Sequence, residues 1–472
     1  MNSKVEQLAL LGGEPIRSKP WILAPHIDEA EKKIFDDLFQ SCSFSKYVGS
    51  GDKRTLEQLS LPSVGLEKID DPWHFLGGKF IRRFCADFAK KFDCQYAIPV
   101  NSATTGLSVA LAALGLSPGD EVIVPAISYS ATGNAPLMFG YIPVFVDVDE
   151  KRFCIDPQKL EEAITPKTKA ILVVHLAGNF ADMDKIMGVA AKHNLYVVED
   201  AAQAIGAKYK NKFAGTIGNV GVFSFQQSKN ISTGEGGMIV TNDVNVAKKA
   251  RLIINHGENL LTNDMNEEEI VNVMGFNFRM TEMSAALGIT QLQKLDRVNR
   301  LRVDNAKILE QKLGGFPGLE IPFASEEYLK NGIVDVPHLF VMLYDENLIS
   351  VKRRTFVEAL TAEGVPVGTG YQRPMYASPN FLKKLFNGFN GAPWDVKKND
   401  KVIYRNGMCP AAENLVYSKF LWFYNIAYPS TAEDMDDVVR AVEKVMLNID
   451  ELAKYEKGNV SGFSSSQGRI LS

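Results

Sequence analysis

Residues 221–237 read GVFSFQQSKNISTGEGG, and the function of the chain depends on how this stretch folds. The apolar run through Val222 and Phe225 predicts a buried strand, which stops at polar residues and is followed by a single lysine, Lys229. A lysine fixed at the end of a strand and partly removed from water loses part of its preference for charge, so it can attack carbonyl carbons. A lysine before a glycine-rich turn is, however, more often an ordinary solvated loop residue.

The composition is typical of a globular protein with more than one domain. The chain has 472 residues, of which 46% are hydrophobic and 23% are charged, and its net charge is −4. This charge gives no reason to expect nucleic acid or a membrane as partner. The five cysteines include no CxxC pair, the six histidines are dispersed, and the first residues lack a signal peptide. We therefore expect a cytoplasmic protein with reduced thiols and no metal site.

Strands and helices alternate along the middle of the chain. Strands are predicted at 121–125, 143–146, 170–175, 195–199, 221–225 and 238–240, and helices at 104–116, 130–139, 157–164 and 183–193. Apolar strands separated by helices predict an α/β fold, with a mostly parallel central sheet covered on both faces. Ligands bind beyond the carboxyl ends of the strands in such sheets.

The remaining sequence indicates three further parts around this large domain. Residues 1–93 form a lead-in with helices at 29–39 and 77–92, and its stretch 41–72 is predicted to be an excursion outside the core. The large domain covers 94–313 and ends with a helix at 277–296, which residues 301–313 either extend or follow as a second helix. A smaller α+β domain follows at 314–457, with strands at 337–344 and 364–370 and helices at 350–363 and 431–452. The tail at 458–472 is expected to be disordered.

Other polar residues also follow predicted strands. Glu199 and Asp200 end an apolar strand, where either can cap a following helix or present a buried carboxylate to a cationic ring nitrogen. The segment NSATTGL at 101–107 opens a helix, so it is either an ordinary helix cap or a phosphate site. Tyr129 can stack on a flat ligand or belong to the core.

Four features thus follow each other along the chain: a helix N-terminus with hydroxyls, an aromatic ring, a carboxylate and a lysine. With these features the sequence resembles the DegT/DnrJ/EryC1/StrS family of sugar aminotransferases, which depend on pyridoxal 5′-phosphate and have the type I fold of aspartate aminotransferase. The resemblance covers nearly the whole chain, through LLGGEP at 10–15, PGDEVIVP at 118–125, PVFVDVD at 143–149, ADMD at 181–184, NFRM at 277–280 and EDMDD at 433–437.

The resemblance implies a role for each candidate residue. Lys229 forms a Schiff base with pyridoxal 5′-phosphate, and Asp200 pairs with the pyridine nitrogen. Gln203 lies near the ring oxygen, and Tyr129 stacks on the ring. The cofactor phosphate contacts Ala103, Thr104, Thr105 and Ser224 in one subunit and Asn277 of the neighbouring one. Ala103 replaces the glycine that is usual at this turn, so the backbone approach there can differ.

Two residues remain less defined on the sequence alone. Arg279 belongs to the same cross-subunit motif as Asn277, and we include it as a candidate substrate contact. His175 stands near a strand end, where it is either packed in the core or in contact with substrate. The shared sites imply a homodimer.

The expected activity is a ping-pong transfer of an amino group from glutamate or glutamine to a keto-cyclitol or a nucleotide-linked keto-sugar. FQQSK at 225–229 and the leader at 8–15 resemble the cyclitol branch more closely, whereas insertions at 41–72 and 387–400 obscure the substrate. A dehydratase on the same scaffold and a non-catalytic protein that retains the fold are alternatives. A nucleotide-dependent oxidoreductase is a weaker one, because no GxGxxG follows the first strand.

Overall fold

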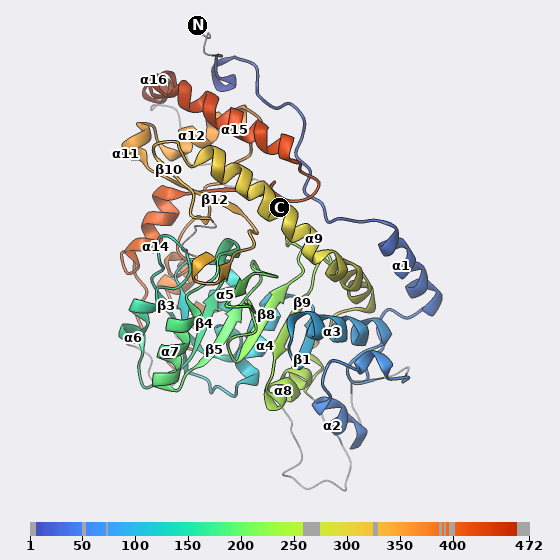
Figure 1. Ribbon diagram of the computed structural model, residues 1–472. Coiled ribbons are helices and arrows are strands. Elements are labelled where there is room, and N and C mark those ends of the chain that lie inside the picture. Colours follow the sequence, from blue (N-terminus) through green and yellow to red (C-terminus); the bar gives the residue numbers. More distant parts are fainter. Residues whose placement is uncertain are drawn as a thin grey trace.

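The computed structural model describes residues 6–459 apart from 50–52, 72–73, 258–273, 324–328, 387–388, 391–392 and 396–401 (Figure 1). Its centre is a seven-stranded sheet with the order β1-β9-β8-β5-β4-β2-β3. The strands are β1 (Tyr96–Val100), β2 (Glu121–Pro125), β3 (Ile142–Val146), β4 (Thr168–Val174), β5 (Tyr196–Asp200), β8 (Val220–Ser224) and β9 (Gly237–Thr241). Only β9 runs antiparallel to its neighbours, so the predicted, mostly parallel α/β sheet is confirmed.

Helices cover both faces of this sheet (Figure 1). One face packs against α3 (Lys79–Phe92), α7 (Met183–His193) and the first half of α9 (Glu282–Leu313). The other packs against α4 (Ala103–Ala113) and α8 (Val244–Ile254). Alternate residues of β4 show why both layers form: Ile171 and Val173 join the first apolar cluster, and Leu172 and Val174 join the second.

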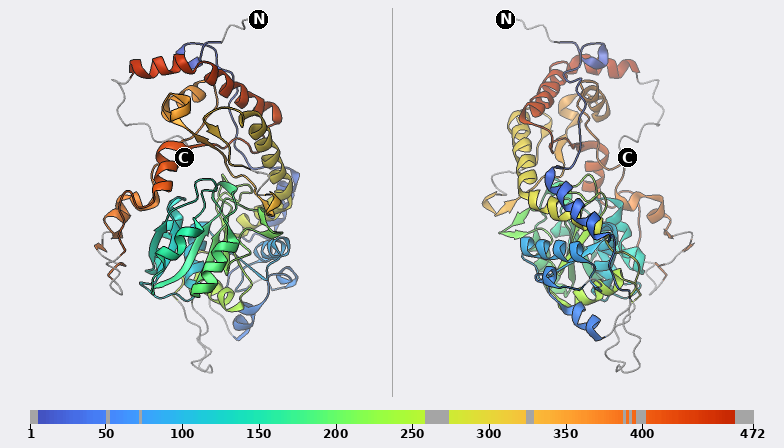
Figure 2. Two further views of the ribbon diagram at one scale, coloured as in Figure 1. Left: turned by 60° about the vertical axis from the view of Figure 1, so that its left-hand side comes forward. Right: turned by 90° about the vertical axis from the view of Figure 1, so that its right-hand side faces the viewer.

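A second, smaller sheet lies beyond the large one. It has the order β10-β12-β15 and consists of β10 (Leu319–Glu320), β12 (Phe340–Tyr344) and β15 (Phe420–Phe423). The helices α12 (Arg353–Ala362), α15 (Ala432–Leu447) and α16 (Ile449–Asn459) gather at this end of the molecule (Figure 2). The remaining elements are α5 (Ser130–Asn134), α6 (Leu160–Ala163), β6 (Lys208–Tyr209), β7 (Lys212–Phe213), β11 (Ile333–Val334), α11 (Glu346–Ile349), α13 (Pro379–Leu382), β13 (Leu385–Phe386), β14 (Phe389–Asn390) and α14 (Pro410–Asn414).

The N-terminal segment joins the two sheets. Leu8 is buried in the apolar cluster of the smaller sheet, and Arg17 forms ion pairs of 2.7 Å with Asp434 and 2.8 Å with Asp437. The chain then continues to α1 (Glu29–Ser41), which packs on α9. Among the described residues, no helix has both the length and the apolar character that a membrane crossing requires.

The excursion predicted at 41–72 is in part a core element, which corrects the sequence interpretation. It contains α2 (Lys53–Ser60), and Leu59 and Leu66 are buried in the main apolar cluster. Arg251 of α8 donates hydrogen bonds of 2.8 Å to the carbonyls of Leu59 and Leu61, so the segment is held at its backbone. The segment is rich in Ser, Gly and charged residues, so its composition predicted exposure rather than burial.

Two other boundaries also differ from the prediction. The helix expected at 277–296 begins only at Glu282, because Asn277 and Phe278 pair as extended chain with Asn255 and Ile254. The helix then continues unbroken to Leu313. The strand expected at 364–370 is reduced to a single bridge between Gly368 and Trp422. Most of the predicted insertion at 387–400, and the predicted tail from 460 onward, lie outside the described residues.

Candidate active site

Asp200 is presented at the carboxyl end of β5. β5 and β8 are parallel and pair Asp200 with Val222, so their ends meet at one edge of the sheet. The buried carboxylate accepts a hydrogen bond of 3.0 Å from the Thr132 hydroxyl and one of 3.2 Å from the Ala202 N–H. The residues after Asp200 form turns, so the alternative of a helix cap is wrong. Burial raises the pKa of Asp200 above its ordinary value, and the Lys229 charge acts in the opposite direction.

Lys229 lies just beyond the end of β8. The chain turns back there, with the Lys229 N–H donating to the Gln226 carbonyl at 2.8 Å. The residue is half-buried, and burial of its amine lowers its pKa from 10.5 to about 8. Asp200 partly opposes this shift, because the carboxylate favours the charged amine. An amine of this kind is neutral in a useful fraction of molecules near neutral pH.

The N-terminus of α4 approaches the same edge of the sheet. Ser102 caps the helix by accepting from the Thr105 N–H at 3.2 Å, and the Thr105 hydroxyl donates to Asn101 Oδ1 at 2.6 Å. Gly237 of β9 pairs with Ser224, and a Cβ on this glycine would lie 2.8 Å from the Ala103 nitrogen. The start of α4 therefore lies directly against the start of β9, next to the end of β8, and glycine at 237 makes this approach possible.

The predicted ring-contacting residues surround this position. The Gln203 Oε1 accepts from the Ala177 N–H at 2.7 Å, and its Nε2 donates to the Tyr371 hydroxyl at 3.4 Å, so both ends of the amide are held. Tyr129 precedes α5 and is 68% exposed, which leaves its ring face accessible. Thr132, one turn later, reaches Asp200. The core-packing alternative for Tyr129 is thus excluded by its exposure.

His175 lies on the opposite side of the sheet edge from Asp200. Its ring and the Glu199 side chain are fully buried, and His175 Nε2 lies 2.9 Å from Glu199 Oε2. The Ala181 N–H donates to His175 Nδ1 at 3.2 Å, which places the ring proton on Nε2, facing Glu199. Both ring nitrogens are occupied, so this enclosure favours the core-packing alternative for His175.

Glu199 is predicted to carry a large share of the stability at this edge. Its two carboxylate oxygens accept from His175 and from the N–H groups of Gly215, Ile217 and Gly218. Replacing Glu199 by Ala leaves these buried donors without partners, so we expect a loss of about 3–5 kcal/mol. A urea unfolding curve measures this loss, with the exposed Glu162→Ala as control. A midpoint equal to that of the control would contradict the prediction.

Asn277 and Arg279, which are predicted to act across a subunit interface, lie on the extended segment before α9. Asn277 is exposed, and its backbone forms a bridge with Asn255. Arg279 donates to Asn255 Oδ1 at 2.7 Å, and its guanidinium lies 5.7 Å from the centre of the Tyr47 ring. Arg279 therefore already has partners within its own chain, whereas the Asn277 side chain is turned to the surface.

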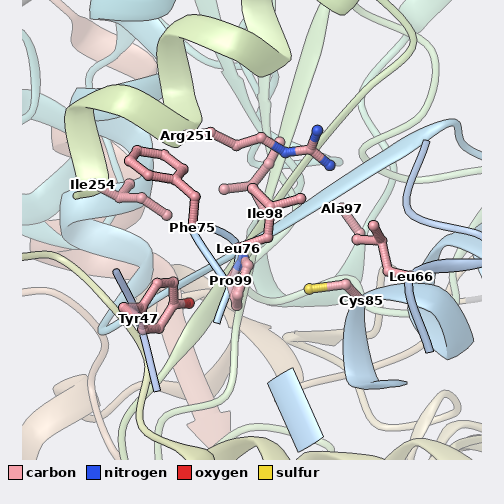
Figure 3. Close-up of a pocket in the computed structure, with 10 residues that line it drawn as sticks. All are labelled: Tyr47, Leu66, Phe75, Leu76, Cys85, Ala97, Ile98, Pro99, Arg251 and Ile254. Carbon is pink, nitrogen blue, oxygen red and sulfur yellow. The ribbon is translucent and has the colours of Figure 1, made fainter. Parts of the chain in front are cut away.

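A small cavity lies apart from these residues, between α3, α8, β1 and parts of residues 47–76 (Figure 3). It is lined mainly by apolar side chains, together with Tyr47, Cys85 and Arg251. About 10 Å³ is open to the centre of a water molecule, which is room for roughly one water. None of the candidate residues lines this cavity, and it is too small for a cofactor.

Several residues near Lys229 were not found from the sequence. Arg302 of α9 and His338, which precedes β12, are both buried, and the Arg302 Nη1 donates to the His338 carbonyl at 3.0 Å. Thr132 contacts Asp200, and Tyr371 contacts Gln203. One signal was available: Asn299, Arg302 and Asn305 interrupt an otherwise apolar stripe of the helix. The other residues carry no local pattern.

Comparison with known proteins agrees with this geometry. The model of the DegT/DnrJ/EryC1/StrS aminotransferase family matches residues 66–412. The chain belongs to this family. It is 46% identical over 248 residues to a GDP-perosamine synthase of Caulobacter vibrioides, which covers 52% of this chain and 66% of the relative. It is 31% identical over 454 residues to an L-glutamine:2-deoxy-scyllo-inosose aminotransferase of Streptoalloteichus tenebrarius, which covers 94% of this chain and 99% of the relative.

A solved aminotransferase shares the fold. The aminotransferase from Psychrobacter cryohalolentis superimposes with a TM-score of 0.74 at 28% sequence identity, over 91% of this chain and all (100%) of that one. The predicted fold class and the prediction of an aminotransferase are therefore confirmed.

Proposed function

We propose that this chain uses pyridoxal 5′-phosphate to move an amino group from glutamate or glutamine to a ketone on a cyclitol or sugar. The observation that carries the proposal is the pair formed by Lys229 and Asp200. Burial lowers the pKa of the Lys229 amine to about 8, and its charge interacts with the buried carboxylate of Asp200. An ordinary loop lysine has neither a buried amine nor such a partner. A protein that merely retains the fold would gain nothing from this costly arrangement.

The residues present fit the three functional parts of this cofactor. An amine that is neutral near pH 8 suits an aldehyde carbon, and a buried carboxylate suits a basic ring nitrogen. The N-terminus of α4, with Ala103, Thr104 and Thr105, suits a phosphate, since the first N–H groups of a helix have no partners within the helix. Ser224 adds a hydroxyl near this N-terminus, because its strand partner on β9, Gly237, lies against Ala103.

When bound, the cofactor supplies an electrophilic carbon and a conjugated ring that stores an electron pair. Lys229 would hold that carbon through its amine and, once freed, would move a proton during the transfer. Asp200 would hold a positive charge on the ring nitrogen, and the hydrogen bonds that it accepts from Thr132 and Ala202 fix the orientation of its carboxylate. Gln203 is held by Ala177 and Tyr371, so it can orient the ring oxygen.

The neighbouring subunit completes the site in this proposal. Asn277 is exposed on the segment before α9, as a residue that reaches the phosphate of a partner subunit must be. Arg279 is tied to Asn255 and Tyr47, so it either supports this segment or contacts substrate from it. We therefore propose a homodimer with shared sites.

A keto-cyclitol is the acceptor that we favour. The similarity to the glutamine:inosose aminotransferase extends over 94% of this chain, whereas that to the GDP-perosamine synthase covers 52%. Nucleotide-linked keto-sugars remain the alternative acceptors, because this chain is more similar to the GDP-perosamine synthase over the part that aligns, at 46% identity.

Two measurements test the proposal. The purified protein should show a visible absorption band that disappears on borohydride reduction, after which peptide mass analysis should find the cofactor on Lys229. Donor glutamine or glutamate labelled with ¹⁵N should then deliver the label to a keto-cyclitol. Cofactor on a different lysine, or a product that loses oxygen without gaining ¹⁵N, would contradict the proposal. The second result would instead indicate a dehydratase.

A further inference from the structure

Arg302 is a buried cation without an acidic partner among the described residues. It lies on α9, is 4% exposed, and donates one hydrogen bond of 3.0 Å to the His338 carbonyl. Burial alone lowers the pKa of Arg302 to about 10, and no neighbouring carboxylate opposes it. The guanidinium nevertheless stays charged at neutral pH. A buried, unpaired charge is costly, and such groups concentrate at functional sites.

The face of α9 that carries Arg302 lies against the lysine loop. Asn299, one turn earlier on the same face, accepts a hydrogen bond of 2.9 Å from the side chain of Asn230, the residue after Lys229. Its own amide donates to the Ile205 carbonyl at 2.9 Å. A Cβ on Gly206 would approach the Asn299 amide to 2.4 Å, so this contact is tightly packed. Arg302 is therefore held at a fixed position relative to Lys229.

Three ionisable groups face the Lys229 amine from three elements. Asp200 comes from β5, Arg302 from α9, and His338 from the segment before β12. The His338 ring is buried with Nδ1 lacking a partner, and burial together with the Lys229 and Arg302 charges lowers its pKa well below the ordinary value. His338 is thus neutral, so the amine has one anion and one permanent cation as neighbours.

We propose that Arg302 is a positioning residue whose fixed positive charge adds to the effect of burial and raises the share of the Lys229 amine that is neutral and nucleophilic at physiological pH. This inference rests on the proposed role of Lys229. The amine attacks a carbonyl carbon only when its lone pair is free, and Asp200, which the ring nitrogen requires, would otherwise favour the ammonium form. Arg302 offsets Asp200 without itself losing a proton.

Competitive labelling of the full-length, cofactor-free protein tests this inference. In trace acetic anhydride the neutral amine attacks the acyl carbon, acetate leaves, and the amine releases a proton to solvent. The acetylated Lys229 peptide, measured by mass spectrometry against pH, gives the midpoint of the amine. We expect a wild-type midpoint near 8. In Arg302→Gln the midpoint should rise, so that labelling at pH 7 falls by about twofold or more.

Two further variants separate charge from structure. Arg302→Lys keeps the positive charge and should keep the midpoint near the wild-type value. Arg300→Gln removes a charge from an exposed position of the same helix and should leave the midpoint unchanged. An unchanged midpoint in folded Arg302→Gln would overturn the inference, as would a wild-type midpoint near 10, where an ordinary lysine titrates. If Arg302→Gln does not fold, Arg302→Met, which also removes the charge and keeps an apolar side chain of similar length, is measured instead and judged by the same criterion.

The two proposals fail in different ways. If borohydride does not attach the cofactor to Lys229 in wild type, the proposed function is wrong, whatever the labelling midpoint. If the cofactor does become attached to Lys229 while Arg302→Gln leaves the midpoint of the amine unchanged, only the proposed role of Arg302 is wrong. A purely structural Arg302 would lower the thermal stability of both Arg302 variants and move the midpoint of neither.

Discussion

The Lys229→Ala variant should lose turnover almost completely, by about 10⁴-fold or more, because the same amine both binds the cofactor carbon and transfers the proton. The protein should still fold, since Lys229 is half-buried and its amine makes no hydrogen bond among the described residues. Cofactor should still bind, because the N-terminus of α4 and Asp200 are unchanged. Amine formation from a keto-cyclitol measures the first effect, and cofactor released on denaturation measures the second.

The control for this variant is Lys307→Ala, an exposed lysine on α9. It should have the activity of wild type. Turnover of Lys229→Ala within tenfold of this control would show that another amine carries the reaction. Loss of both activity and cofactor would mean that Lys229 mainly holds the cofactor in place.

The Asp200→Asn variant should lower turnover by about 10²–10³-fold, because an amide cannot hold a positive charge on a ring nitrogen. The substitution preserves shape, and the new amide can still accept from the Ala202 N–H and donate to the Thr132 hydroxyl. Stability should therefore change little. The variant also removes the anion that raises the pKa of Lys229, so the midpoint of lysine labelling should fall below about 8.

Two comparisons make the Asp200 result specific. Thr132→Val removes the 3.0 Å hydrogen bond to the carboxylate, together with the 2.8 Å hydrogen bond between the Thr132 and Ser128 hydroxyls, and should lower turnover about tenfold or less. Asp304→Asn removes an exposed carboxylate from α9 and should have no effect. An Asp200→Asn enzyme that is as active as Asp304→Asn would exclude charge stabilisation at the ring nitrogen.

The strand ends of the site could be predicted from sequence because each is a local pattern. An apolar run followed by Asp200 or by Ser224 marks the edge of a parallel sheet, and the structure places both residues at the ends of β5 and β8. Strand alternation also explains why neighbouring acids differ. Glu199 faces His175 beneath the edge, whereas Asp200 faces Thr132 on the other side.

The groups that tune the site could not be predicted in the same way. Arg302 and His338 reach Lys229 from a helix and a segment that follow it by more than seventy and one hundred positions, and only tertiary packing brings them there. The burial of Leu59 and Leu66 was missed for the same reason, since partners such as Arg251 lie far along the chain. Local periodicity contains no information on such pairs.

The contacts of the N-terminal segment have a consequence for how the protein is made. Leu8 packs beneath the smaller sheet, and Arg17 pairs with Asp434 and Asp437, which leave the ribosome last among these residues. At ordinary rates of synthesis, of about 5–20 residues per second, the first residues wait tens of seconds for these partners. Arg17 therefore cannot form its ion pairs until nearly the whole chain has been made, and a chain that ends before residue 434 would hold its N-terminal segment only through earlier partners such as Glu363.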